Sequence, residues 1–90
     1  MITIEQFKTT VARRLRLPPE SIYGKSLRLS EVVARSPVAS NSIDLVEAVA
    51  GAMAELGIDE QVDLPAITLD HSVDDLVREV DRQLQAIPQA

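Results

Sequence analysis

The chain has 90 residues, 46% of them hydrophobic, and it contains no cysteine, which excludes disulfides and thiolate metal sites. A chain of this length fits one domain with a small core. The net charge of −5 is uneven, because residues 1–25 carry five basic and two acidic side chains, whereas the rest carries four arginines and twelve acids. This acidic part makes a poor nucleic-acid binder, since phosphates are repelled, and it suits partners with basic docking faces.

Membrane and export signals are missing from the sequence. No apolar run approaches the ~20 residues that a membrane-spanning helix needs. The N-terminal segment is amphipathic, without the basic start and apolar block of a signal peptide. We therefore expect a cytoplasmic protein. Met1 and the short tail after Pro88 lead us to expect a freestanding protein with a single domain over residues 1–90.

The first predicted helix covers residues 3–16, where apolar side chains recur at steps of three and four. Thr3 and Gln6 form a capping-box pair at its start, and the proline pair at 18–19 ends it. Three basic residues load its last turn, namely Arg13, Arg14 and Arg16. We interpret them as compensation of the helix dipole on a solvated face, rather than as a docking patch.

A long connection follows over residues 17–41. Serine, proline and glycine punctuate it, but apolar residues such as Leu27 and Val32 also occur, and a pure linker would not carry them. Long loops inside compact domains are usually functional or disordered, and the apolar content favours a packed loop. One or two helical turns are expected near Ser30 to Arg35.

A strongly apolar second helix is predicted over residues 42–56. Asn41 or Ser40 caps its start, and Gly57 suits its C-terminal end. Its polar positions form one stripe, namely Asp44, Glu47, Gly51 and Glu55. A helix this apolar is either central to the core or keeps an apolar strip for a partner.

The last third of the chain is predicted to be an acidic, turn-rich segment followed by a final helix. Residues 58–71 are compatible with a short helical turn at Leu64–Ile67. Three acids of this segment lack the spacing of a calcium loop and indicate a solvated turn, namely Asp59, Glu60 and Asp63. Ser72 then caps a helix that runs to about Ala86, with two acids in its first turn.

No strand pattern is evident, so the predicted class is all-α. We expect a small three-to-four-helix bundle with a long first loop. Its predicted core consists of Phe7, Val11, Val46, Leu56, Ile67, Val73 and Leu76.

Ser42 is the candidate functional residue, because its hydroxyl lies at the mouth of an apolar helix with acids one turn further in. It stands in the stretch NSIDLVE, residues 41–47, which resembles the modified-serine motif of acyl and peptidyl carrier proteins. In that family the serine follows an acid, precedes a leucine-like residue and begins the second helix. Here Ile43 takes the leucine-like place, Val46 belongs to the family's apolar–acid pair, and the resemblance extends over about residues 4–84.

The resemblance implies a covalent cofactor on Ser42. A phosphopantetheinyl transferase would attach a 4′-phosphopantetheine arm from coenzyme A, and the arm would carry an acyl or aminoacyl group as a thioester. The resemblance also implies a short third helix near Ile67. Serine is a weak nucleophile that needs this external enzyme, so the protein itself is expected to catalyse nothing.

The resemblance also implies docking enzymes that load or process the acyl group, such as a ketosynthase, an acyltransferase or an adenylating ligase. The residues expected to face them are Asp44, Val46, Glu47 and Ala50. Small residues around Ala50 either pack helices closely, which we favour, or leave room for a short acyl chain.

Departures from the family pattern point to a specialised role. Asn41 stands where the family usually has aspartate. Asparagine keeps the side-chain oxygen that caps the helix but lacks the negative charge. Met53 and Ala54 fall where carriers of fatty-acid synthesis often have acids. These differences favour a carrier for a polyketide, fatty-acid-like or other secondary biosynthetic pathway.

The sequence is compatible with one other function class and disfavours another. The main alternative is an unmodified small helical interaction domain, which uses the apolar strip of the second helix to bind a partner. An enzyme is disfavoured, because the chain has a single histidine, His71, no cysteine, no glycine-rich phosphate loop and no metal-ligand pattern.

Overall fold

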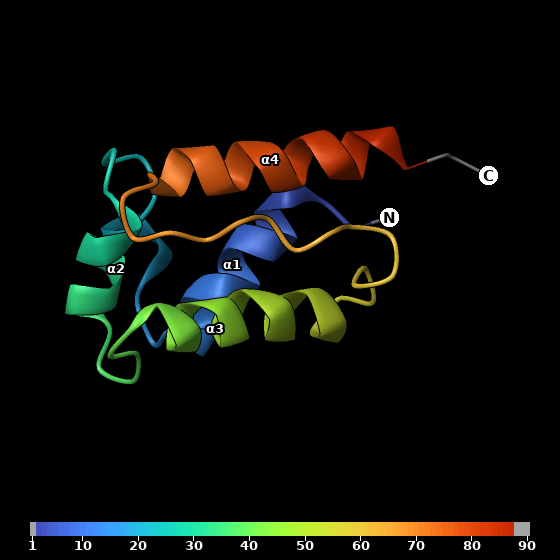
Figure 1. Cartoon of the computed structure of the whole chain (residues 1–90). Coiled ribbons are helices and arrows are strands. Elements are labelled where there is room, and N and C mark those ends of the chain that lie inside the picture. The colour runs from blue at the N-terminus through green and yellow to red at the C-terminus, as the bar shows by residue number, and fades with distance from the viewer. Residues whose placement is uncertain (1, 88–90) are drawn as a thin grey trace.

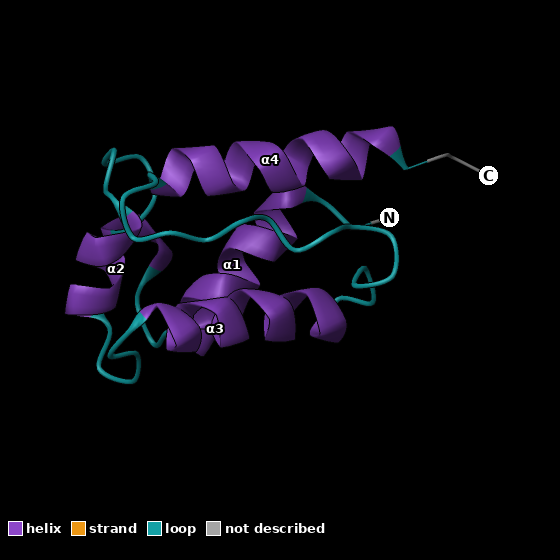
Figure 2. Cartoon of the chain, viewed as in Figure 1, coloured by secondary structure: helices purple, strands orange, loops and turns teal. Residues whose placement is uncertain are grey.

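The computed structural model describes residues 2–87 and shows four α-helices (Figure 1). They are α1 (Ile4–Arg14), α2 (Leu29–Arg35), α3 (Ser42–Glu55) and α4 (Val73–Ala86), with a 3-10 turn at Pro19–Ser21. The described part of the chain contains no strand, and its one extended pairing is an isolated antiparallel bridge between Arg28 and Ser72 (Figure 2). The predicted all-α bundle with a long first loop is confirmed. Met1 and Pro88 lie outside the described residues.

The helices form a bundle in which α4 and α3 lie on opposite sides (Figure 1). Between them runs α1, which contacts both. The short α2 closes one end of the bundle and contacts α3. The segment that joins α3 to α4 crosses the front of the molecule between these two helices (Figure 1). No helix of residues 2–87 is long and apolar enough to cross a membrane.

Helix α1 begins as predicted and ends two residues early. The Thr3 hydroxyl accepts a hydrogen bond from the Gln6 main-chain N–H at 3.2 Å, and the Gln6 side chain accepts one from the Thr3 N–H at 2.9 Å. At the other end Arg16 adopts a left-handed conformation, with φ of 56°. The Leu17 N–H then donates back to the Ala12 carbonyl at 3.0 Å, as in a Schellman motif.

Helix α3 ends in the same way, here with the predicted glycine. Gly57 has φ of +73°, a conformation that costs glycine little. The Ile58 N–H donates to the Met53 carbonyl at 3.0 Å. The prediction of Gly57 as the terminating residue is therefore confirmed.

The first connection is packed, as predicted. Ile22, Leu27 and Leu29 are buried within it, and α2 forms where helical turns were expected. Tyr23 fixes this connection to α1: its hydroxyl donates to the Lys8 carbonyl at 2.8 Å, and the Lys8 ammonium lies 4.9 Å from the ring centroid. Burial raises the pKa of Tyr23, because it disfavours the phenolate.

The second connection contradicts the predicted helical turn at Leu64–Ile67 and the short third helix near Ile67. Residues 63–68 are non-helical and run along the bundle (Figure 2). A helical stretch advances only 1.5 Å per residue against about 3.3 Å for extended chain, so a helix here would shorten the span from α3 to α4. Pro65 also lacks an N–H to donate to a preceding carbonyl.

The core extends over all four helices, and most of the predicted members belong to it. Phe7, Val11, Val73 and Leu76 are buried, while Leu56 and Ile67 are half-buried and pack against the buried set. Val46 is a correction, since it is only half-buried on the flank of α3. The buried face of that helix is formed by Leu45, Ala48, Val49, Ala52 and Met53. Helix α3 is therefore central to the core, and its remaining apolar residues face outward.

Candidate functional site

Ser42 is the first residue of α3 and is partly exposed. Asn41 is the helix cap: its side-chain oxygen accepts a hydrogen bond from the Asp44 N–H at 3.0 Å. Because Asn41 caps the helix, the Ser42 side chain does not. The Ser42 hydroxyl has no hydrogen-bond partner among residues 2–87. A serine in this position presents an unengaged hydroxyl at the positive end of the helix dipole.

The Asp44 carboxylate turns back toward the preceding loop. One of its oxygens accepts hydrogen bonds from the Ser40 main-chain N–H at 2.8 Å and from the Ser40 hydroxyl at 3.0 Å. These bonds lower the pKa of Asp44, because they favour the ionised form. Asp44 thereby fixes the two residues directly before Ser42. Sequence reasoning placed Asp44 toward a partner and missed this local role.

Ser36 anchors the other end of the same loop. Its hydroxyl donates to the Leu15 carbonyl at 2.8 Å and accepts from the N–H groups of Val38 and Ala39 at 3.3 and 3.1 Å. The side chain thus ties the loop before α3 to the end of α1. Its role was missed, although a serine before a proline is a common turn signal. Together, Ser36 and Asp44 fix the two ends of the loop that precedes Ser42.

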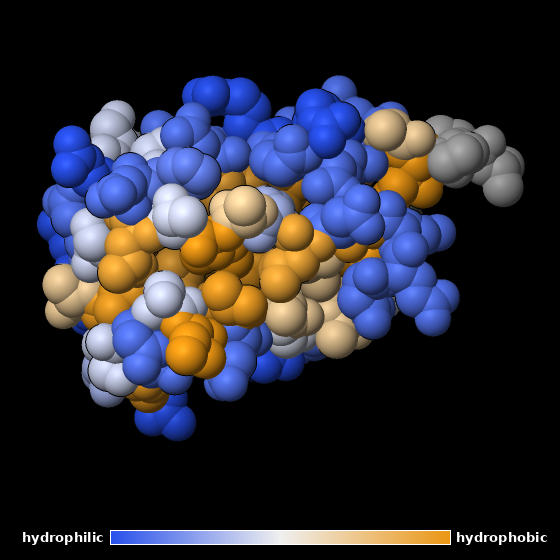
Figure 3. Space-filling model, viewed as in Figure 1, coloured by the Kyte–Doolittle hydropathy of each residue, from blue (hydrophilic) through white to orange (hydrophobic). Residues whose placement is uncertain are grey.

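Two large apolar side chains close to Ser42 in sequence are exposed. Ile43 is 66% exposed and Val38 is 49% exposed. Val46 lies one turn beyond Ser42 and is half-buried. On the face of the molecule drawn in Figure 3, apolar atoms also gather over α3 and the segment that crosses in front of it. An exposed apolar group beside an unengaged hydroxyl suits a binding surface.

The four predicted partner-facing residues do not share one environment. At 100° per residue, Val46, Glu47 and Ala50 fall on the outward side of α3 with Ile43, and Glu47 is exposed. Asp44 falls on the other edge, in line with Gly51 and Glu55. The structure therefore brings together three of the four and separates Asp44.

Helix α1 covers the far end of the predicted polar stripe. Both Arg13 and Arg14 pair with Glu55, the latter at 3.2 Å between Nε and a carboxylate oxygen. The hydrogen bond from Arg13 and the two positive charges lower the pKa of Glu55. The two arginines, predicted to compensate the dipole on a solvated face, also link α1 to α3. Glu47 is left as the stripe's outward-facing acid.

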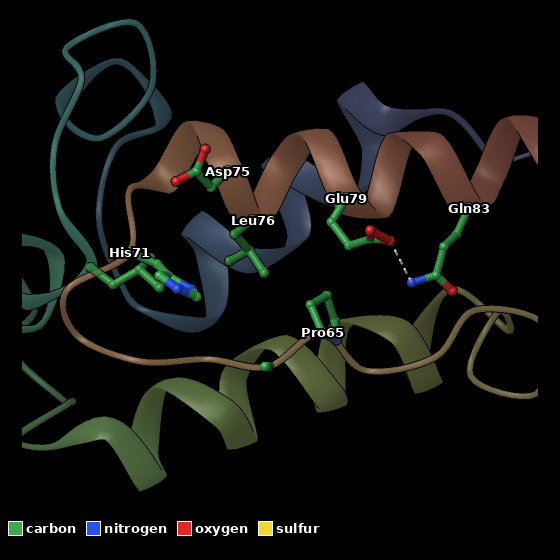
Figure 4. A pocket seen from close by; sticks show the side chains of 8 residues that line it. Pro65, His71, Asp75, Leu76, Glu79 and Gln83 are labelled. Atoms are coloured by element: carbon green, nitrogen blue, oxygen red, sulfur yellow. Dashed lines mark hydrogen bonds between the residues drawn. The ribbon is translucent and has the colours of Figure 1, made fainter.

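Two cavities differ in their capacity for a ligand. A core cavity lined by residues such as Phe7, Leu45 and Leu76 has a volume of about 20 Å³, room for about one water and far below the roughly 300 Å³ of a small ligand pocket. The small residues of α3 are used for packing, since Ala48 and Ala52 are buried. A larger groove of about 400 Å³ lies between α4 and the second connection (Figure 4).

In the described range, no group of three or more His, Cys, Asp or Glu side chains is placed to hold a metal ion. His71 is exposed and lines the larger groove. No family model matches the chain, and comparisons with curated proteins and with solved structures gave no match. The function is therefore inferred from the surroundings of Ser42 and from the motif around it.

Proposed function

We propose that this protein is a carrier protein, in which Ser42 bears a 4′-phosphopantetheine arm that holds an acyl or aminoacyl group as a thioester. The observation that carries the proposal is the unengaged hydroxyl of Ser42 at the start of α3, on a loop fixed by Asp44. The N–H groups of Ser42 and Ile43 have no hydrogen-bond partner within residues 2–87. They point along the helix start, where a phosphodiester is favoured.

Attachment of the arm requires an external transferase. The Ser42 oxygen would attack the β-phosphorus of coenzyme A, forming the new oxygen–phosphorus bond as the bond to the departing 3′,5′-adenosine diphosphate breaks. The serine proton must pass to a base. One Asp44 carboxylate oxygen accepts both hydrogen bonds from Ser40, and neither Asp44 oxygen is hydrogen-bonded to Ser42. A phosphopantetheinyl transferase would supply the base.

The outward side of α3 would receive the enzymes that load and process the acyl group. Ile43 and Val46 offer apolar contact, and Glu47 offers a charge for a basic docking face. Candidate partners are a ketosynthase, an acyltransferase or an adenylating ligase of a specialised polyketide, fatty-acid-like or other secondary pathway. The tether raises the concentration of the acyl group at each partner's active site.

The same structure favours an acyl group carried at the surface. The core cavity of about 20 Å³ has no room for an acyl chain unless helices move apart. Ala50, on the outward side of α3, does not border that cavity. The protein would therefore present its cargo rather than store it.

Intact mass spectrometry tests the proposal. Wild type, Ser42→Ala and the matched control Ser30→Ala, at an exposed serine of α2, are incubated with coenzyme A and a broad-specificity transferase. Wild type and Ser30→Ala should each gain one phosphopantetheinyl group, and Ser42→Ala none. A wild type that is never modified, or an alanine variant at Ser42 that is, would refute the assignment.

A second candidate function rests on the exposed apolar side chains alone. Ile43 and Val38 would suit an unmodified interaction domain that binds a partner through the start of α3. In that case the wild-type protein isolated from its own cells carries no arm, and Ile43→Asp abolishes partner binding while Ser42→Ala leaves it intact. A carrier instead bears the arm in its own cells and loses it in Ser42→Ala.

A further inference from the structure

A groove lies on the side of the molecule where the second connection runs beside α4. Its floor is apolar, with Leu29 and Leu76 almost fully buried, and Pro65 rises into it from the connection (Figure 4). From α4, Glu79 and Gln83 point down toward the connection (Figure 4). The volume of about 400 Å³ lies within the range of ligand-binding pockets. The proposed function makes no use of this groove.

The main chain along this groove is largely unpaired. No hydrogen bond from the N–H groups of Leu64, Ala66, Ile67 or Thr68 occurs within residues 2–87, and none reaches the carbonyls of residues 64–67. These residues are non-helical, and exposure alternates between more and less buried positions from Leu64 to Thr68. Unpaired main-chain groups in extended chain are a template for an additional strand.

Both ends of this stretch are already paired by peptide-like groups. The Gln83 side-chain amide donates to the Asp63 carbonyl at 3.1 Å and accepts from the Asp63 N–H at 2.7 Å, as a neighbouring strand would. At the other end the Leu29 N–H donates to the His71 carbonyl at 2.8 Å. Both ends of the unpaired stretch are therefore fixed to the bundle.

The charge around the groove is strongly negative. Residues 58–87 contain eight acids and two arginines, a net charge of −6. Asp75 and Glu79 line the groove. Their arginine partners, Arg78 and Arg82, have side chains that are 76% and 68% exposed, so these pairs are solvated and each is worth little. A cationic ligand is favoured over a neutral or anionic one.

We propose that this groove binds an extended, basic peptide segment of a partner protein, which adds as a strand beside residues 64–68. Main-chain hydrogen bonds would supply affinity, alternate apolar side chains would pack on Pro65 and Ala66, and lysine or arginine side chains would meet Asp75 and Glu79. A helix is a poorer fit, because its diameter is about 10 Å and it has no free main-chain groups to offer. The proposal does not depend on modification of Ser42.

Titration of the isotope-labelled protein with short synthetic peptides, followed by amide NMR shifts, tests this assignment. The probe is a capped peptide of alternating lysine and valine, compared with one of alternating glutamate and valine and with a lysine–valine peptide N-methylated at alternate residues. We expect the first to shift the amides of residues 64–71 and of α4 with a dissociation constant of about 1 mM or lower. The other two should bind at least about tenfold more weakly.

Matched variants locate the charge contribution. Asp75→Asn should weaken binding of the lysine–valine peptide about threefold, whereas Asp74→Asn, in the same first turn but outside the groove, should change it less than about twofold. Ser42→Ala should bind as wild type does, so failure here is separate from failure of the carrier assignment.

Three outcomes would overturn the proposal. One is the lack of any shift at residues 64–71 at millimolar peptide. Another is equal binding of the N-methylated peptide, which would show that main-chain hydrogen bonds do not contribute to binding. The last is equal sensitivity to Asp74→Asn and Asp75→Asn, which would reduce the interaction to general charge attraction.

Discussion

The guanidinium of Arg14 lies directly over Gly51, so a Cβ at Gly51 would stand 2.6 Å from the Arg14 Nη1 atom. This contact explains why position 51 in α3 is a glycine, which the sequence pattern did not explain. A side chain at position 51 would displace Arg14 from the position in which it pairs with Glu55. Gly51, Arg14 and Glu55 together set how closely α1 approaches α3.

Replacement of Gly51 by alanine should therefore depend on Arg14. In an Arg14→Ala background, Gly51→Ala should stabilise the protein by about 1 kcal/mol, because alanine has the higher helix propensity. In the wild-type background the gain should be smaller, because the arginine must move. Urea unfolding of the four proteins of this double-mutant cycle measures the difference. Equal effects of Gly51→Ala in both backgrounds would contradict the contact.

The ion pairs of Glu55 should make stability depend on pH at the acid end. The pKa of Glu55 is lowered in the folded protein, so its contribution is present above the ordinary carboxyl pKa of about 4 and is lost as the pH falls through the lowered value. The melting temperature of Glu55→Gln should lie below that of wild type at pH 7, and the gap should close toward about pH 3. Glu60→Gln, at an exposed turn position, is the control and should give a smaller gap at pH 7. A Glu55 gap that stays constant with pH would show that the pairs do not contribute.

Substitutions of Asn41 separate its role in capping α3 from any role in the proposed modification of Ser42. Asn41→Asp should keep the free energy of unfolding within about 1 kcal/mol, because both residues cap helices well, and Asn41→Ala should lose about 1 kcal/mol. If the proposed transferase uses an acid beside the serine, Asn41→Asp should also be modified faster than wild type. Modification at an unchanged rate would show that the transferase serving this protein does not use that charge.

Glu47 tests the proposed docking side of α3. Glu47→Lys should slow acyl loading by a cognate enzyme, and the wild-type rate should fall as salt rises, since exposed charge steers encounters and salt screens it. Unfolding free energy should change by no more than about 0.5 kcal/mol, as is usual for an exposed position. Glu60→Lys makes the same charge change elsewhere and should load normally. Loading that ignores both Glu47→Lys and salt would place the docking side elsewhere, with the Arg13–Arg14 pair next to test.

Helix boundaries were predictable wherever one residue type satisfies the end of a helix by itself. Thr3, Asn41 and Ser72 each cap the helix that the sequence assigned to them, and Gly57 ends α3. These are short-range effects of one side chain on the next turn. The end of α1 was predicted less well, because Arg16 adopts a left-handed conformation that its residue type does not favour.

Long-range pairings could not be predicted from local pattern. The start of the non-helical stretch at residues 63–68 is held by Gln83, which lies 20 residues away from Asp63 in sequence. The division of the α3 polar stripe is set by arginines of α1, 41 and 42 residues before Glu55. At Ser42 the sequence indicated the accessible hydroxyl, but the roles of Ser36 and Asp44 in supporting it became visible only in three dimensions.

The bond from Tyr23 to the Lys8 carbonyl also gives the protein a natural optical reporter. The chain has one tyrosine and no tryptophan, so its near-ultraviolet signal comes almost wholly from this joint between α1 and the first connection. Burial raises the pKa of Tyr23, so the folded protein keeps the phenol neutral at alkaline pH, where an unfolded chain ionises near pH 10. Stability must then decline as the pH rises above about 10, and phenolate absorbance in that range records the unfolded fraction without any added dye.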